Sequence, residues 1–72
     1  MKKIKKIKIK LNGKNKTIED GYSLNELIND LNIPIKKVAI ELNQEIIDKK
    51  KLKNIKIQNG DKIEIVHFIG GG

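Results

Sequence analysis

The chain has 72 residues, of which 38% are hydrophobic and 35% are charged, and this is enough for one small domain with a single core. A domain of that size cannot enclose a sizeable active-site cavity, so function is expected at an edge or a terminus. The absence of cysteine excludes disulfides, thiolate zinc sites and thiol nucleophiles on this chain.

The net charge of +7 is concentrated near the N-terminus. Residues 1–18 hold eight lysines and no acid, whereas residues 19–72 hold eight lysines and nine acids. A basic segment of this kind attracts polyanions. However, all the basic residues are lysine, and only Tyr22 and Phe68 could stack on a base, so we do not expect nucleic acid to be the main partner.

No segment of the sequence has the pattern of a membrane span or a signal peptide. The longest apolar run covers residues 38–40, far short of the roughly 18 residues that cross a bilayer. Lysines interrupt the N-terminal region where a signal peptide would be apolar. We therefore expect a protein that neither spans a membrane nor is secreted by that route, and that acts in the cytoplasm.

The first predicted strand follows a basic N-terminal extension. Ile7, Ile9 and Leu11 alternate with lysines, which is typical of a strand with one buried face. Ile4 breaks this alternation, so residues 1–5 are expected to form an extension outside the domain.

A hairpin turn follows the first strand. Asn12 and Gly13 both tolerate positive φ, and this pair is typical of a tight type I′ turn. Residues 14–19 are therefore predicted to return as the second strand.

The next predicted element is an amphipathic helix. Ser23 and Glu26 have the spacing of a capping box, in which each side chain accepts a hydrogen bond from a backbone N–H of the first turn. The apolar positions recur with helical period and define one stripe: Leu24, Leu27, Ile28 and Leu31. Asn32 and Pro34 are expected to end the helix.

Two short strands and a crossover follow the helix. Residues 38–42 alternate in polarity and predict a third strand, and residues 45–47 predict a short fourth strand after a turn at Asn43 and Gln44. Residues 49–55 have no clean period and are interpreted as a crossover with one helical turn, its lysines facing solvent.

The last predicted strand covers residues 62–69, after a turn at residues 59–61, and leads directly to three glycines. If Ile63 and Ile65 point into the core, Val66 and Phe68 lie on the outer face, exposed beside the glycine tail. Exposed apolar side chains in that place favour a docking surface, and the alternative is that a loop or the N-terminal extension covers them.

The element order ββαββ predicts an α+β domain with one mixed sheet and one main helix across one face. This is the order of the ubiquitin-like β-grasp fold, in which the first and last strands pair in parallel at the centre of the sheet. We assign residues 6–69 to this domain and residues 70–72 to a flexible glycine tail.

The sequence holds no set of residues suited to catalysis, so we expect a protein that is not an enzyme. Ser23 is used as a helix cap, Thr17 lies in a strand, and no metal site can be built on a single histidine. His67 is interpreted as a packed or hydrogen-bonded residue near the end of the last strand. The glycine run alone fits either a frayed end or a presented terminus.

Four segments together resemble the ThiS family, the bacterial sulfur carriers of thiamine biosynthesis within the ubiquitin-like β-grasp proteins. They cover nearly the whole chain: residues 8–14, 23–27, 38–43 and 59–72. The last segment is the most specific, because Gly-Asp precedes an alternating strand that closes in His-Phe and terminal glycines. The lysine content and the N-terminal extension differ from the family pattern.

The resemblance implies that Gly72 is the working residue. An adenylating partner enzyme, using ATP and magnesium, would convert the Gly72 carboxylate to an acyl-adenylate, and a sulfur donor would then produce a thiocarboxylate. The thiocarboxylate would deliver sulfur to thiazole synthase. The resemblance implies a tail role for Gly70 and Gly71, partner docking by Val66, Phe68 and Ile69, and no cofactor or metal bound by this chain.

Two other functions remain open from the sequence. One is that of the small subunit of molybdopterin synthase, a related carrier that also ends in Gly-Gly. The other is a basic RNA-binding module that uses the lysine-rich first hairpin.

Overall fold

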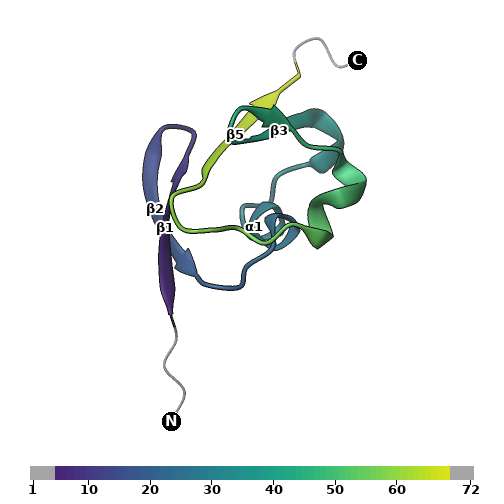
Figure 1. Ribbon diagram of the computed structural model, residues 1–72. Helices are drawn as coiled ribbons and strands as arrows, with labels where there is room; N and C mark the ends of the chain where they lie inside the picture. Colours follow the sequence, from purple (N-terminus) through teal and green to yellow (C-terminus); the bar gives the residue numbers. More distant parts are fainter. Residues whose placement is uncertain (1–4, 69–72) are drawn as a thin grey trace.

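The computed structural model describes residues 5–68, which form a single mixed sheet with one α-helix across one face (Figure 1). The elements in chain order are β1 (Lys6–Leu11), β2 (Lys14–Glu19), α1 (Leu24–Asp30), the 3₁₀ turn η1 (Ile35–Lys37), β3 (Val38–Leu42), β4 (Glu45–Ile46), the 3₁₀ segment η2 (Lys49–Asn54) and β5 (Lys62–His67). The five strands are arranged in the order β2-β1-β5-β3-β4. This confirms the predicted α+β class and the ββαββ order.

β5 lies at the centre of the sheet, as predicted. It pairs in parallel with β1 through Lys10–Lys62 and Leu11–Ile63. On its other side it pairs antiparallel with β3 along five positions, from Leu42–Ile63 to Val38–His67. β5 therefore continues beyond the end of β1, and its last residues have a strand neighbour on the β3 side (Figure 1).

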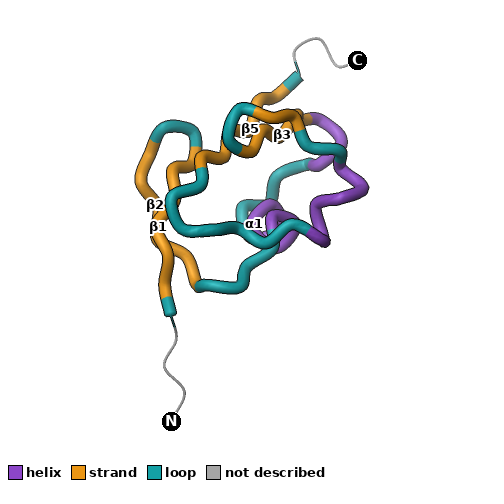
Figure 2. Tube along the Cα trace, in the orientation of Figure 1, coloured by secondary structure: helices purple, strands orange, loops and turns teal. Residues whose placement is uncertain are grey.

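Both tight turns predicted in the sheet are present. Asn12 and Gly13 have φ of 50° and 81°, and Asn43 and Gln44 have φ of 52° and 72°. Two consecutive residues with positive φ are the signature of a type I′ turn, whose twist matches that of the flanking strands. In Figure 2 the β1–β2 turn is drawn in teal as a short connection between two strands.

The side chains of the two asparagines also hold β5 in place. Asn12 lies in the β1–β2 turn, and its Oδ1 accepts a hydrogen bond from the backbone N–H of Ile65 at 2.7 Å. Asn43 lies in the β3–β4 turn, and its Oδ1 accepts one from the N–H of Lys62 at 2.9 Å. The central strand is thus fixed from both sides by turn residues as well as by its strand neighbours.

The helix has the predicted boundaries. Ser23 Oγ accepts a hydrogen bond from the N–H of Glu26, and Glu26 Oε1 accepts one from the N–H of Ser23, which completes the capping box. At the other end Asn32 takes a φ of 55°, and the N–H of Ile33 donates to the carbonyl of Ile28. This is a Schellman-type end, in which asparagine replaces the usual glycine.

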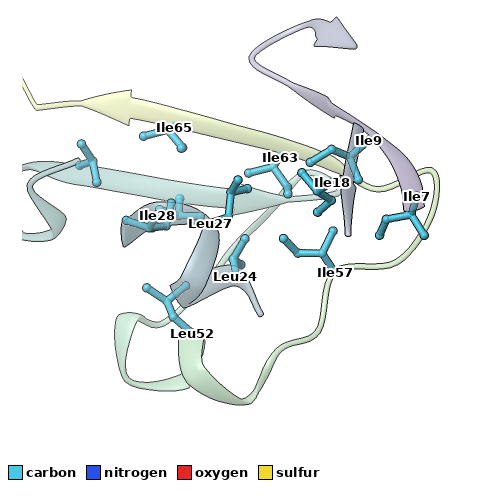
Figure 3. Packing of buried hydrophobic residues seen from close by; sticks show 12 residues of the cluster. Ile7, Ile9, Ile18, Leu24, Leu27, Ile28, Leu52, Ile57, Ile63 and Ile65 are labelled. Atoms are coloured by element: carbon cyan, nitrogen blue, oxygen red, sulfur yellow. The ribbon is translucent and has the colours of Figure 1, made fainter. Parts of the chain in front are cut away.

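The core lies between the helix and the inner face of the sheet (Figure 3). Its buried members are Ile7, Ile9, Ile18, Leu24, Leu27, Ile28, Val38, Ile40, Leu52, Ile57, Ile63 and Ile65. Leu52 of η2 and Ile57 of the following loop were not predicted as core residues, because single apolar residues among lysines show no period. Nevertheless each is only 1% exposed.

Several element boundaries differ from the sequence predictions. The 3₁₀ turn η1 was not predicted, the fourth strand ends at Ile46, and β5 ends at His67. The carbonyl of Lys5, which was assigned to the N-terminal extension, accepts a hydrogen bond from the N–H of Asp20 at 2.8 Å and so continues the hairpin. Within residues 5–68, no helix has the length and apolar character that crossing a bilayer requires.

Candidate functional site at the end of the central strand

The outer side chains of β5 are exposed at the end of the strand that leads to the C-terminus. Val66 is 52% exposed and Phe68 is 53% exposed, whereas Ile63 is fully buried and Ile65 is 8% exposed. The predicted strand phase is therefore confirmed. The docking role of Val66 and Phe68 stays a prediction.

Phe68 is held in place although its ring lies outside the core. Its backbone N–H donates to the carbonyl of Lys37 at 2.9 Å, which continues the antiparallel pairing beyond β5. The ammonium of Lys49 lies 5.3 Å from the centroid of the Phe68 ring, at the distance of a cation–π contact. The ring is thus supported by one cation and still presents about half of its surface to solvent.

The neighbours of Val66 on the outer face extend the apolar surface. Ala39 of β3 is its direct cross-strand partner and is partly exposed. We call Ala39, Val66 and Phe68 the apolar patch. Next to the patch, Glu41 and Glu64 form the following cross-strand pair, so two carboxylates border the patch on the side away from the C-terminus.

One exposed apolar residue on this face was not predicted. Ile46 of β4 is 75% exposed, and it pairs with Glu41 on the outer face of the sheet. The adjacent residues Ile46 and Ile47 could have predicted this exposure. Successive side chains of a strand point to opposite faces, so one of the two isoleucines must lie on the outer face. Ile47, the other one, packs partly buried against the core.

The predicted residues nearest the C-terminus lie outside the described part of the chain. These residues are Ile69, Gly70, Gly71 and Gly72. Their roles in docking, in the tail and in sulfur transfer remain predictions.

The residues considered for catalysis are placed apart. As predicted, Ser23 caps the helix and Thr17 lies in a strand, where its side chain is exposed. His67 is exposed rather than packed, which corrects the earlier interpretation, and the reason is that it is the last residue of β5. Within residues 5–68, no group of three or more histidine, aspartate or glutamate side chains is placed to hold a metal ion.

A hollow with a volume of about 380 Å³ lies between β2 and α1. On it the hydroxyl of Tyr22 donates a hydrogen bond to the carboxylate of Asp30. This bond, together with the negative charge of Asp30, raises the pKa of Tyr22 above its ordinary value. No residue of β5 lines this hollow, so we do not assign the carrier site to it.

A five-stranded mixed sheet with one α-helix across one face and the last strand at its centre defines the ubiquitin-like β-grasp fold. Comparison with known proteins assigns the chain to one family within this fold. Residues 9–72 match the model of the ThiS family. The chain therefore belongs to the ThiS family.

Individual relatives agree with this assignment. The sulfur carrier protein ThiS of Bacillus subtilis (strain 168) is 38% identical over 65 residues, which cover 89% of this chain and 98% of that protein. The crystal structure of the thiamine biosynthesis protein ThiS from Geobacter metallireducens superposes with a TM-score of 0.81 at 28% identity, covering 92% of this chain and 100% of that one. The predicted family and fold are confirmed.

A second kind of relative is much longer than this chain. A thiazole synthase of Paramagnetospirillum magneticum is 36% identical over 66 residues, and a thiazole synthase of Magnetococcus marinus is 39% identical over the same length. The match covers 92% of this chain in both cases, but it spans only a fifth (20%) of each of those proteins.

Proposed function

We propose that this chain carries sulfur as a thiocarboxylate on Gly72 and donates it for thiazole formation in thiamine biosynthesis. The observation that supports this most directly is the position of β5. The strand is fixed at the centre of the sheet, and its outer side chains are exposed immediately before the glycine terminus. A partner that binds the apolar patch would hold the chain at Phe68, four positions before Gly72.

The chemistry requires an activated terminus. A carboxylate resists nucleophilic attack, so one oxygen of Gly72 first attacks the α-phosphate of ATP, giving an acyl-adenylate and releasing pyrophosphate. A sulfur donor of hydrosulfide type then attacks the carbonyl carbon and displaces AMP. Glycine suits this terminus because a tail without Cβ passes through a narrow channel and leaves the carbonyl unhindered.

The catalytic groups and the cofactors of this reaction belong to the partners in our proposal. The adenylating enzyme supplies the ATP and magnesium sites, and this chain supplies the acyl end and the docking face. Thiazole synthase is proposed as the acceptor. The supporting observation is that two proteins of that name contain a segment similar to this chain. We propose the cytoplasm as the place of this reaction.

Intact mass spectrometry tests the proposal. The full chain is incubated with the cognate adenylating enzyme, ATP, magnesium and a sulfide source, and we expect its mass to rise by the exchange of one oxygen for one sulfur. Fragmentation should place the exchange on Gly72. A chain lacking Gly72 is the matched control and should keep its mass. An unchanged mass of the full chain, with an enzyme shown to adenylate, would contradict the proposal.

A further inference from the structure

Three lysines lie together on the outer face of the sheet, which is the face turned away from the helix. We call Lys8 and Lys10 of β1 and Lys62 of β5 the basic strip, and all three are exposed. Lys10 and Lys62 are direct partners in the parallel pair of central strands, so their side chains leave the sheet side by side. Lys8 precedes Lys10 by two residues and therefore shares its face.

The neighbours of the strip on β2 carry no charge, whereas on β5 Glu64 follows Lys62 by two residues and lines a second hollow together with Lys10 and Lys62. On β2, the cross-strand partner of Lys8 is Thr17 and that of Lys10 is Asn15. Like charges placed directly opposite each other in a sheet are destabilising, so the Lys10–Lys62 pair lowers the stability of the free domain. The stability of the fold therefore does not account for this pairing.

The three lysines of the strip line one common hollow. The hollow is shallow, has a volume of about 280 Å³ and is also lined by Ile9, Asn15, Asn59 and Gly60. No carboxylate side chain lines it. An acidic side chain of a partner that entered this hollow would lie among three lysine side chains.

The strip and the apolar patch lie in one line on the sheet. Along β5 the outward residues are, in order, Lys62, Glu64, Val66 and, just beyond the strand, Phe68. Val66 lies four positions after Lys62, which is a distance of about 13 Å in an extended strand. Between them lie Glu64 and its cross-strand partner Glu41. The face therefore changes from basic to acidic to apolar toward the C-terminus.

We propose that the basic strip binds an acidic surface on the protein that receives Gly72, so that strip and apolar patch form one docking face. This inference rests on the proposed function. A folded protein surface matches a face that alternates in sign, whereas a phosphate backbone laid along the same line would be repelled by Glu41 and Glu64. The strip also has no arginine and no aromatic ring, the groups with which proteins read and stack nucleic-acid bases.

The substitution Lys10→Glu separates binding from folding. It removes one positive charge from the strip and places a carboxylate opposite Lys62, where an opposite-charge pair is favourable. The thermal unfolding midpoint should therefore not fall. Lys51→Glu is the matched control, because Lys51 is exposed on η2, a segment that contacts α1 on the other side of the sheet, and the change in net charge is the same.

The readout is the association rate of the full chain with its cognate adenylating enzyme, measured by stopped flow at low and at physiological salt. Exposed charges at an interface act mainly on association, so we expect Lys10→Glu to slow it about tenfold at low salt and less at higher salt. Lys51→Glu should change it by about twofold at most. Lys51→Glu should still be loaded with sulfur on Gly72 as the wild-type chain is.

Three results would overturn the inference. Equal association rates for Lys10→Glu and Lys51→Glu would show that the strip makes no specific contact. Binding of the wild-type chain to polyuridylate more tightly than to the enzyme, abolished by Lys10→Glu, would assign the strip to a polyanion. If the wild-type chain neither bound the enzyme nor gained sulfur, the proposed function would fail as well, which distinguishes that outcome from the first.

Discussion

Ile65 and Phe68 lie three residues apart near the end of β5, yet they contribute to different properties. Ile65 points into the core and is 8% exposed, so Ile65→Ala should lower the free energy of unfolding by about 2–5 kcal/mol. Phe68 is about half exposed, and Phe68→Glu should change it by about 1 kcal/mol or less, even with loss of the Lys49 contact. Chemical denaturation of both variants measures this difference.

The same two variants should rank in the opposite order in partner binding. Phe68→Glu places a carboxylate in the apolar patch and should weaken the complex with the adenylating enzyme far more than Ile65→Ala does under conditions where both are folded. If Phe68→Glu unfolded the domain while Ile65→Ala left its stability unchanged, the docking face would be wrongly assigned.

Tyr22 is expected to ionise at a higher pH than an ordinary tyrosine. Its phenol donates to the Asp30 carboxylate, and the ionised carboxylate opposes formation of a phenolate, so the pKa of Tyr22 is raised in the folded state. Because the folded pKa lies above the unfolded value of 10.0, this contribution to stability is fully present below pH 10 and is lost as the pH rises through the folded pKa.

Ultraviolet absorbance can follow this titration directly, because Tyr22 is the single tyrosine and the chain has no tryptophan. Asp30→Asn removes the carboxylate and should move the midpoint down toward the ordinary value. A midpoint that is the same in the wild type and in Asp30→Asn would contradict the assigned hydrogen bond.

At the scale of the elements, Asn12 connects the first hairpin to the central strand. Asn12→Gly keeps the positive φ of the turn but removes the acceptor for the Ile65 N–H, and it should lower the free energy of unfolding by about 1 kcal/mol. Asn12→Asp keeps a side-chain oxygen in the same place and is the control. Amide hydrogen exchange should show faster exchange at Ile65 in Asn12→Gly than in Asn12→Asp.

The elements also show which features of the fold can be predicted from the sequence alone. Alternation in β1 and β5, the Asn-Gly turn and the Ser23 capping box depend on residues close in sequence, and the structure confirms each of them. The bond between Asn12 and Ile65 joins residues 53 positions apart, so no local pattern predicts it. The basic strip likewise depends on the register of Lys10 and Lys62, which the sequence does not state.

The core contributions of η2 and its following loop were missed for a different reason. The short 3₁₀ segment η2 buries only Leu52, so its apolar residues do not recur with the period of a helix or a strand. Ile57 lies in the loop that follows and is buried there without belonging to a periodic segment. At the candidate site, the exposure of Val66 and Phe68 was predicted from strand phase. The predicted packing of His67 was wrong, because a residue's phase does not indicate where the covered part of the sheet ends.

At the scale of the whole molecule, β1 begins at one end of the domain and β5 ends at the other (Figure 1). A tag placed before residue 1 should therefore leave partner docking and sulfur loading unchanged. A single residue added after Gly72 should abolish loading, because the proposed adenylation needs a free Gly72 carboxylate. Intact mass after the loading reaction measures both, and efficient loading of the extended chain would place the sulfur elsewhere.

The central position of β5 has a consequence for how the domain is made. β5 is the last of the five strands in chain order. In the sheet, β1 and β3 do not pair with each other, and β5 joins them by pairing with both. On the ribosome, the two hairpins and the helix are synthesised first, but they can only be joined once β5 has left the exit tunnel. A chain whose synthesis stops before β5 therefore lacks the strand that completes the sheet. We expect such a chain to stay unfolded and to be degraded by proteases. Completion of the sheet thus depends on the same strand that carries the apolar patch.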